Sequence, residues 1–537
     1  MYTAIERLMV WCGLSWRHII IFGFLYTAIL SMYAISDAID DTTINMYGKV
    51  FGLENKEIDA EKQWTVYVIP ALLVPVIVAS GYLMMRFGRF IVIMGTLVVM
   101  AALSPILIFP DSYATYSAGF ILHGTVLKAI VIGGLMIYAY ETVPIKYRRV
   151  ALISLSVFAS LGRIAFAIGR YISGNLGYGS AEETDVIRSQ YSIMLGVVCG
   201  TLILPIILGI VVRKDSPVSL VVRGFERQVY RYLVSWRCGD VSTAPPMNED
   251  DFVYQVEVER ERSYMDFKTM CVRKWPALLF LFLTGYAWQL IDIVFMTPYK
   301  YLVLDHFGGG YDLNPHYGLV IFNCCCLAGT LVAIVYILHC RSITILPGIA
   351  MGLLFVGACI CAPVEPFYID GGVGAGKGNP IEYQFLPMNQ IIVGQIIMWV
   401  GFTLSQFLWG LLIVEIVPGT YRPVVVMAQM GFLEFTHMAI RAIYIKYNWE
   451  GRGLYIACTV ILGLIAVAYM IVFVGTNWFS RADPAEEDDG EIAIDVLDEE
   501  EVYLENGKGA NLDSFMYASN SNGATAGGLS SARVAGF

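Results

Sequence analysis

The sequence predicts an all-α membrane protein in which about twelve transmembrane helices form two pseudo-symmetric six-helix bundles. Hydrophobic residues make up 57% of the 537 residues, only 15% are charged, and the mean hydropathy is +0.63. A water-soluble globule does not have this composition. Apolar runs of about 20 residues, long enough to cross a hydrocarbon core, recur along the chain. One ten-residue pattern also occurs in each half of the sequence, which indicates an internal duplication.

The apolar runs fix the order of the predicted elements. We place the membrane spans near residues 16–36, 64–85, 90–109, 115–140, 150–173, 191–212, 275–298, 317–338, 343–363, 388–413, 423–445 and 453–475. After an N-terminal segment at 1–15, the two bundles cover 16–212 and 275–475. We expect short amphipathic helices on the membrane surface in the linker 213–274. The tail 476–537 carries runs of Asp and Glu, which predict a solvated, disordered segment.

Charge predicts the orientation of the chain. Basic residues such as Arg86, Arg149 and Lys214 fall in alternate connections, which are therefore cytoplasmic together with both termini. The opposite connections carry acidic residues such as Asp37 and Glu182, so a cationic solute would be enriched at the outer face. We expect the plasma membrane as the location.

The duplicated pattern lies between apolar runs in both halves. Its copies are Glu141-Thr-Val-Pro-Ile-Lys-Tyr-Arg148 with two further residues, and Glu415-Ile-Val-Pro-Gly-Thr-Tyr-Arg422 with two further residues. They are predicted to form equivalent cytoplasmic turns of two homologous bundles. Such internal repeats are typical of secondary transporters, so the sequence predicts solute transport.

A second turn supports a family resemblance. The turn between the second and third spans is Gly81-Tyr-Leu-Met-Met-Arg86-Phe-Gly88-Arg89. Together with the duplicated pattern it resembles the major facilitator superfamily. Within that superfamily the chain looks most like the organic-ion transporters, which carry organic cations, carnitine and organic anions. Tyr147-Arg-Arg after the fourth span and Asp215-Ser-Pro217 at the start of the linker add to this resemblance, although only the turns match closely.

The resemblance implies alternating access, in which two bundles rock around a central cavity and charged turns close the cytoplasmic side. The residues that it assigns to gating are Gly81, Arg86, Gly88, Arg89, Glu141, Arg148, Glu415 and Arg422. Here Glu141 and Glu415 would pair with arginines and break those pairs in each cycle. Alternatively, the pairs are static salt bridges of the interface. The chain departs from the family at Met85, where an acidic residue is usual, and this favours an inward-open state or a loss of transport.

Two charges are predicted near the bilayer midplane. Glu434 lies about 18 Å beyond Arg422 along the eleventh span, and Lys128 lies about 20 Å from the cytoplasmic end of the fourth. The organic-ion transporters place a charge-selecting residue at the position of Glu434, acidic in cation carriers, so the resemblance implies a cationic solute. Glu434 would otherwise pair with His437 or Arg441 on its own helix. Lys128 is predicted to reach Glu434, either as a pair that the solute displaces or as a static pair.

Other residues in the spans have weaker signals. We expect Arg163, Arg170 and Asp292 to serve packing or an outer gate before solute contact. A cation binds to aromatic ring faces. The aromatic candidates in the first, fourth, seventh and tenth spans are Tyr26, Tyr33, Tyr138, Tyr286, Trp288, Trp399, Phe402 and Trp409.

Several function classes find no support in the sequence. No phosphate-binding Gly-x-x-x-x-Gly-Lys-Ser/Thr loop is present, and the six histidines are not spaced with carboxylates or cysteines as a metal or nucleophile site requires. We therefore expect no enzyme, no cofactor and no nucleic-acid partner. The expected partners are a small organic ion, membrane lipids and a cytoplasmic partner for the acidic tail.

The predicted function is transport of a small organic ion, preferably a cation, by uniport, by exchange or with ion coupling. In a proton-coupled carrier Glu434 would be the titrating group. The alternative is a transporter-like protein that moves nothing and acts as a solute receptor or as the membrane subunit of a complex. Met85 and the acidic tail support that alternative. A third reading is a sugar or proton-coupled solute carrier, because sugar carriers share the Glu-x-x-Pro turns.

Overall fold

The computed structural model describes most of both predicted bundles. The described residues are 16–39, 41–53, 68–143, 145–172, 184–225, 267–291, 294–295, 316–339, 345–361, 385–447 and 452–471. The predicted N-terminal segment 1–15, most of the linker 213–274 and the tail 476–537 lie outside these ranges. Within them the chain forms helices and turns and no β-strand. A backbone in lipid must satisfy its hydrogen bonds within one segment, and a helix does so.

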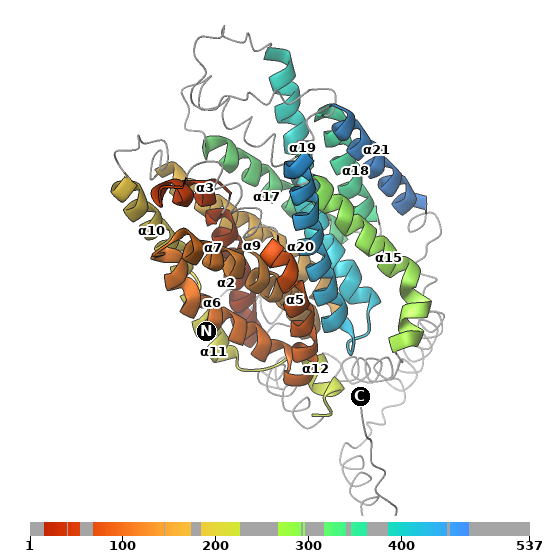
Figure 1. The fold of residues 1–537 in the computed structure, drawn as a ribbon. Helices are drawn as coiled ribbons and strands as arrows, with labels where there is room; N and C mark the ends of the chain where they lie inside the picture. Colours follow the sequence, from red (N-terminus) through yellow and green to blue (C-terminus); the bar gives the residue numbers. More distant parts are fainter. Residues whose placement is uncertain are drawn as a thin grey trace, which may run out of the picture. The chain divides into compact units, whose positions relative to one another are not determined.

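The first half of the chain contains eleven described helical segments, which Figure 1 draws from red to yellow. They are α2 (Trp16–Ala38), α3 (Asp41–Val50), α5 (Ile69–Phe87), α6 (Arg89–Ile108), α7 (Tyr113–Ile121), the π-helical turn η2 (Leu122–Val126), α8 (Leu127–Thr142), α9 (Ile145–Ile172), α10 (Thr184–Gly200), α11 (Ile203–Val212) and α12 (Pro217–Val222). α7, η2 and α8 follow one another without a break and form one span. α12 starts after Ser216, whose hydroxyl accepts a hydrogen bond from the Ser219 amide, and Pro217 suits its first turn.

The second half contains six described helices, drawn from green to blue (Figure 1). They are α15 (Phe267–Ile291), α17 (His316–His339), α18 (Ile345–Cys361), α19 (Phe385–Ile416), α20 (Arg422–Tyr447) and α21 (Arg452–Tyr469). In the described part of the chain, nine helical segments are long and apolar enough to cross a membrane. Three shorter apolar helices, Leu281–Ile291, Gly348–Cys361 and Ile456–Tyr469, fall in the remaining predicted spans.

Helices of the two halves pack directly against each other. α5 lies along α20, as Figure 1 shows, and α9 lies along α17. The approach of α5 to α20 is closest at Gly81, where an added Cβ would lie 2.7 Å from the carbonyl oxygen of Pro423. Only glycine fits that contact, because the group opposite is backbone and cannot move aside. The glycine therefore sets how closely the halves meet at this end.

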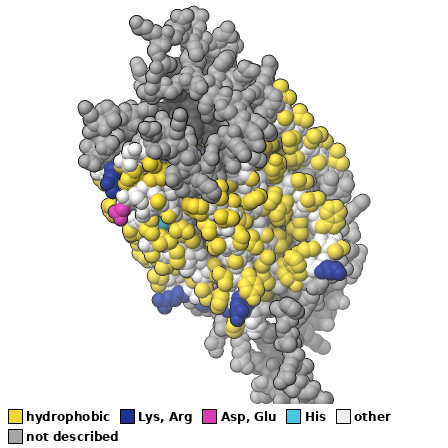
Figure 2. Space-filling model, in the orientation of Figure 1, with side chains coloured by type: hydrophobic (Ala, Val, Ile, Leu, Met, Phe, Trp, Pro, Cys, Tyr) yellow, Lys and Arg dark blue, Asp and Glu magenta, His cyan; other side chains and the backbone are white. Residues whose placement is uncertain are grey.

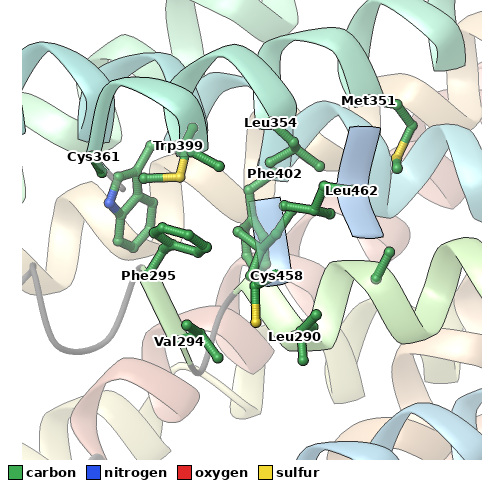
Figure 3. Close-up of a cluster of buried hydrophobic side chains, with 14 of the residues drawn as sticks. Leu290, Val294, Phe295, Met351, Leu354, Cys361, Trp399, Phe402, Cys458 and Leu462 are labelled. Carbon is green, nitrogen blue, oxygen red and sulfur yellow. The ribbon is translucent and has the colours of Figure 1, made fainter. Parts of the chain in front are cut away.

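The second half has its own apolar core, shown in Figure 3. Phe295 beyond α15, Leu354 of α18, Trp399 of α19 and Leu462 of α21 converge there, together with Phe322 of α17. In lipid such a cluster is held by close van der Waals packing rather than by exclusion of water. Five helices of this half are thereby fixed as one body.

The outer surface of the helices is apolar. Leu72, Val197, Val332 and Leu464 are each at least 65% exposed. Figure 2 shows one face on which hydrophobic side chains predominate and the basic side chains lie toward its ends. Lipid chains cover such a surface without cost, whereas water does not.

Candidate gating and solute-binding sites

The turn between α5 and α6 is a single residue, Gly88. Its φ of 105° lies in the left-handed region, which favours glycine. The carboxylate of Asp215, from the start of the linker, occupies the position where a side chain at Gly88 would begin. Asp215 also accepts a hydrogen bond from the Phe90 amide at 3.0 Å, so it satisfies one of the free N–H groups at the start of α6. The turn thus has a carboxylate, although Met85 occupies the position where the family has an acid.

Arg89, Glu141 and Arg422 form what we call the buried ion cluster. Arg89 Nε lies 3.2 Å from Glu141 Oε2, and Arg422 Nη1 lies 3.1 Å from Glu141 Oε1. The three side chains are between 0% and 3% exposed. Because Arg422 belongs to α20 and the other two to α6 and α8, one carboxylate joins the two halves. Arg89 Nη2 also donates to the carbonyl oxygen of Gly419 across the same interface, at 2.8 Å.

The start of the linker completes the surroundings of the cluster. The Ser216 hydroxyl donates to Glu141 Oε2. The Ser219 hydroxyl accepts from Arg89 Nη1 at 3.2 Å and donates to Asp215 Oδ2 at 2.6 Å. Charges removed from water are tolerated when most of their hydrogen-bonding groups find partners. These contacts serve both oxygens of Glu141 and both terminal nitrogens of Arg89, whereas Arg89 Nε has no hydrogen bond among the described residues.

The second copy of the duplicated pattern forms a weaker contact. Glu415 Oε1 lies 2.8 Å from Arg149 Nε, again across the halves, but the side chains are 18% and 44% exposed. Of the other predicted gating arginines, Arg148 donates from Nε to the Val143 carbonyl at 3.1 Å, and Arg86 is exposed in the last turn of α5. Sequence reasoning missed Arg149. Arg148 and Arg149 are adjacent and carry the same side chain, so only the rotation of α9 about its axis decides which of them faces Glu415.

Glu434 lies on the face of α20 that points to the first half. A Cβ added to Gly133 of α8 would lie 2.6 Å from Met427 Cε and 3.1 Å from Met430 Cγ. Glu434 follows Met430 by one helical turn and Met427 by two, so it continues the same face. Its side chain is half-buried, and no described residue forms a hydrogen bond or ion pair with it.

The first half carries charges near the end of α2, which we call the N-half charge group: Tyr33, Ser36, Asp37, Lys128 and Arg163. Lys128 Nζ donates to Ser36 Oγ at 3.2 Å. Arg163 Nε lies 3.9 Å from Asp37 Oδ1, and the guanidinium carbon lies 4.7 Å from the centre of the Tyr33 ring. Two cations and one carboxylate thus lie together at the last turns of α2. Residue spacing alone did not predict that these three charges are neighbours.

The predicted pairs of Glu434 do not form among the described side chains. Lys128 contacts Ser36 in place of Glu434. The Nδ1 atom of His437 lies 2.9 Å from Gln289 Oε1 of α15, so this ring is directed to the seventh span. The side chain of Arg441 lies outside the described structure, as do those of Arg170, Asp292 and Trp409.

Three of the predicted aromatic residues form a group in the second half. The rings of Trp288 and Phe402 are stacked with centroids 4.3 Å apart, and Trp288 Nε1 donates to the Phe402 carbonyl at 3.2 Å. Trp399 meets Phe402 edge-on at 6.3 Å. Tyr286 is more exposed, at 36%. Trp399 and Phe402 belong to the core of Figure 3, and Trp288 packs against it.

The predicted aromatic residues of the first half are bound within that half. The hydroxyl of Tyr26 lies 2.7 Å from Ser154 Oγ, and its ring stacks on Phe158 at 4.0 Å. Tyr138 is fully buried and donates to the carbonyl of Lys214 at 2.8 Å, beside the linker. Both hydroxyls thus form hydrogen bonds within the first half. Tyr138 lies at the end of α8 that contributes Glu141 to the buried ion cluster.

Several buried amide and indole groups in the second half were missed by sequence reasoning. Asn323 Oδ1, Trp399 Nε1 and Gln429 Oε1 have no hydrogen-bond partner among the described residues. Each such group costs about 1–3 kcal/mol unless it is satisfied. The sequence signal was an amide inside an apolar span. In the described structure no group of three His, Cys, Asp or Glu side chains is placed to hold a metal ion.

Comparison with known proteins identifies the fold. No family model and no curated protein matches the sequence. The structure is similar to the proton:xylose symporter XylE bound to 6-bromo-6-deoxy-D-glucose, with a TM-score of 0.65, 15% identity, and coverage of 86% of this chain and 97% of XylE. It also resembles the xylose transporter XylE from E. coli in a partially occluded inward-open conformation, with a TM-score of 0.59, 16% identity, and coverage of 84% and 98%.

The transporter FucP of the major facilitator superfamily, in its outward conformation, matches with a TM-score of 0.51, 10% identity, and coverage of 83% and 97%. Likeness at these identities shows the fold. The chain therefore has the major facilitator fold of about twelve membrane helices, and the predicted fold class is confirmed. The neighbours do not single out the organic-ion transporters within that fold.

Proposed function

We propose that the protein carries a small organic ion, preferably a cation, across a membrane by alternating access. The observation that supports this most strongly is the carboxylate of Glu141, shared between Arg89 of its own half and Arg422 of the other. In this structure the cluster joins the two halves at one end. A carrier must separate the halves there once in every cycle.

The arrangement allows this separation at a moderate cost. When α20 moves away, Glu141 keeps Arg89 as its counter-ion, so no carboxylate is left bare in the first half. Arg422 keeps its hydrogen bond from Nε to the Val414 carbonyl, at 2.8 Å, and gains water. Both states therefore satisfy their charges, as a two-state gate requires.

Glu434 supports the preference for a cation. A carboxylate at this depth in a membrane costs at least a few kcal/mol unless it faces a partner or a pathway. Among the described residues it has no partner, and it faces the other half. A bound cation would supply the missing charge and link the halves, which would couple binding to rocking.

The test is uptake of labelled organic cations into vesicles that contain the purified protein. We expect saturable uptake in the wild type and its loss in Glu434→Gln, which keeps the shape and removes the charge. Asp111→Asn is the matched control, because it neutralises an exposed carboxylate between α6 and α7 that lies outside both candidate sites. Uptake that is equal in all three proteins would contradict the role of Glu434.

A neutral polyhydroxylated solute is the second candidate. Its support is the set of buried polar atoms without partners, Asn323 Oδ1, Trp399 Nε1 and Gln429 Oε1, because hydroxyl groups can satisfy both donors and acceptors. Hexose uptake that survives Glu434→Gln and falls in Gln429→Leu would favour this candidate. Cation uptake with the opposite pattern would favour the first.

We further propose that the ion-cluster end and both termini face the cytoplasm of a plasma-membrane protein. The basic connections support this orientation. A receptor or complex subunit, with the acidic tail binding a cytoplasmic partner, would retain the fold without transport. Asp215 argues against that alternative, because its carboxylate lies at the turn where Met85 replaces the acidic residue that is usual in the family. Binding of solute without any uptake, or recruitment of a partner by the tail alone, would support it.

A further inference from the structure

We propose that Tyr140, the residue before Glu141, is a positioning residue of the gate, whose ring holds Arg422 against the first half in the closed state. This inference rests on the proposed function and deepens it, because it adds an aromatic contact to the gate that the buried ion cluster forms. Sequence reasoning did not single out Tyr140, and its ring takes no part in the ion pairs of the cluster.

Two guanidinium groups lie over the ring of Tyr140. The guanidinium carbon of Arg422 is 4.9 Å from the centre of the ring, and that of Arg148 is 5.0 Å from it. The face of an aromatic ring is negative and attracts a cation within about 6 Å of its centre. Arg148 and Arg422 occupy the same place in the two copies of the duplicated pattern. One ring of the first copy therefore contacts the equivalent arginine of both copies.

Only one of these two contacts crosses between the halves. Arg148 lies on α9 in the same half as Tyr140, and its Nε atom donates to the Val143 carbonyl of that half at 3.1 Å. Arg422 lies on α20, and its Nε atom donates to the Val414 carbonyl of the second half at 2.8 Å. When α20 moves away, the ring therefore loses Arg422 and keeps Arg148. The contact with Arg422 belongs to the closed state alone, whereas the contact with Arg148 is common to both states and cancels.

The surroundings strengthen the contact of the ring with Arg422. Arg422 is 2% exposed and Tyr140 is half-buried, and a cation attracts a ring face more strongly when water is excluded. Arg422 also shares the single carboxylate of Glu141 with Arg89. The ring therefore offers Arg422 a further attractive contact from the same helix, next to the carboxylate.

The second copy of the pattern lacks the ring. Val414 stands before its glutamate, at the place that Tyr140 has in the first copy. The ion pair of that copy, Glu415 with Arg149, is also more exposed. The aromatic residue thus accompanies the copy whose ion pairs are buried, where a contact between a cation and a ring contributes most.

Spin labels on the two halves test the inference on the full chain in lipid nanodiscs. Tyr82 of α5 and Val272 of α15 are exposed, so labels carried there by a non-natural amino acid report the separation of the halves. Tyr140→Phe keeps the ring face, and we expect the distance distribution of the wild type. Tyr140→Leu removes the face, and we expect the ratio of closed to open molecules to fall by roughly tenfold.

The chain offers a matched control for the loss of a ring. The ring of Phe225 lies 5.0 Å from the guanidinium carbon of Arg223, a contact inside the start of the linker. Phe225→Leu removes a contact of the same kind and length that does not cross between the halves. It should leave the label distance unchanged.

Fluorination of the ring separates the attraction of charge from packing. Phenylalanine and its mono-, di- and trifluorinated forms at residue 140 have nearly the same shape, but each fluorine draws electrons from the ring face. We expect the ratio of closed to open molecules to fall with each fluorine, and the trifluorinated ring to behave like Tyr140→Leu. The same ratio for every ring in the series would overturn the inference, because a ring that only fills space is insensitive to its electrons.

Glu141→Gln separates failure of this inference from failure of the proposed function. A longer label distance in Glu141→Gln, with no change across the fluorinated series, would overturn the inference and leave the gate standing. An unchanged distance in Glu141→Gln would contradict the gate itself, and the inference with it. A shift in Tyr140→Phe equal to that in Tyr140→Leu would also overturn the inference, since it would place the effect in the hydroxyl group.

Discussion

Neutralising Glu141 should open the ion-cluster end of the protein. Glu141→Gln keeps the size of the side chain but removes the charge that lies 3.2 Å from Arg89 and 3.1 Å from Arg422. Two guanidinium groups would then be buried beside one neutral amide. Removal of one partner from a buried ion pair typically costs about 3–5 kcal/mol.

The open state escapes most of this cost, because Arg422 gains water when α20 moves away. The closed state should therefore lose about 3 kcal/mol relative to the open one, at the lower end of that range because Gln can still accept a hydrogen bond. A change of this size lowers the ratio of closed to open molecules by roughly 100-fold. The more exposed pair of Glu415 with Arg149 serves as the comparison for the buried ion cluster, since exposed ion pairs contribute about 0–1 kcal/mol to stability.

Spin labels on the two halves can measure this shift. Tyr82 of α5 and Val272 of α15 are 57% and 65% exposed, so labels introduced there as non-natural amino acids disturb little packing and spare the native cysteines. We expect a longer mean distance in Glu141→Gln and an unchanged one in Glu415→Gln. The same distance distribution in Glu141→Gln as in the wild type would refute the assignment of the cluster as a gate.

Three further predictions follow from contacts near the cluster. Gly81→Ala should open the same end, because its Cβ would lie 2.7 Å from the backbone oxygen of Pro423, whereas Gly95→Ala, with no atom within 4 Å, should leave the label distance unchanged. Asp215→Ala should lower the free energy of unfolding by at least about 1 kcal/mol, because it removes the cap of α6 together with the contacts of this carboxylate to Ser219 and Arg223, and an unchanged denaturation midpoint would count against that role. Arg149→Ala should cost less than about 1 kcal/mol in the same denaturation experiment, and a larger loss would mean that this pair is not the weak one.

The membrane helices were predictable because lipid imposes one solution on the backbone. A run of apolar residues long enough to cross the membrane must be helical, and its position can be counted directly. The π-helical turn at Leu122–Val126 inside the fourth span was not predicted, although His123, Gly124 and Thr125 interrupt the apolar run there. The ring of His123 is buried and lies 2.9 Å from the carbonyl oxygen of Met100 on α6, a contact that residue spacing does not reveal.

The buried ion cluster was only partly predictable. The duplicated pattern pointed to Glu141 and Arg422, and the turn at Gly88 pointed to Arg89. Which arginine meets which carboxylate depends on the phase of each helix, so Arg149 took the place expected for Arg148. The hydrogen bond from Ser216 depends on how the linker docks, which no spacing in the sequence encodes.

The predicted contact of Lys128 with Glu434 is not formed, for a similar reason. Counting residues gives the depth of a charge in the membrane, but it does not say whether two charges at one depth lean toward or away from each other. Lys128 reaches Ser36 of α2 instead, because its side chain leans toward the start of its own helix.

The most direct test of transport by alternating access is counterflow in vesicles that contain the purified protein. Vesicles preloaded with an unlabelled organic ion should take up the labelled ion faster than empty vesicles, because a loaded carrier returns to the outside more readily than an empty one. We expect this acceleration in the wild type and its loss in Glu434→Gln. Binding of the labelled ion without any uptake, in preloaded and in empty vesicles alike, would contradict the account and identify a receptor instead.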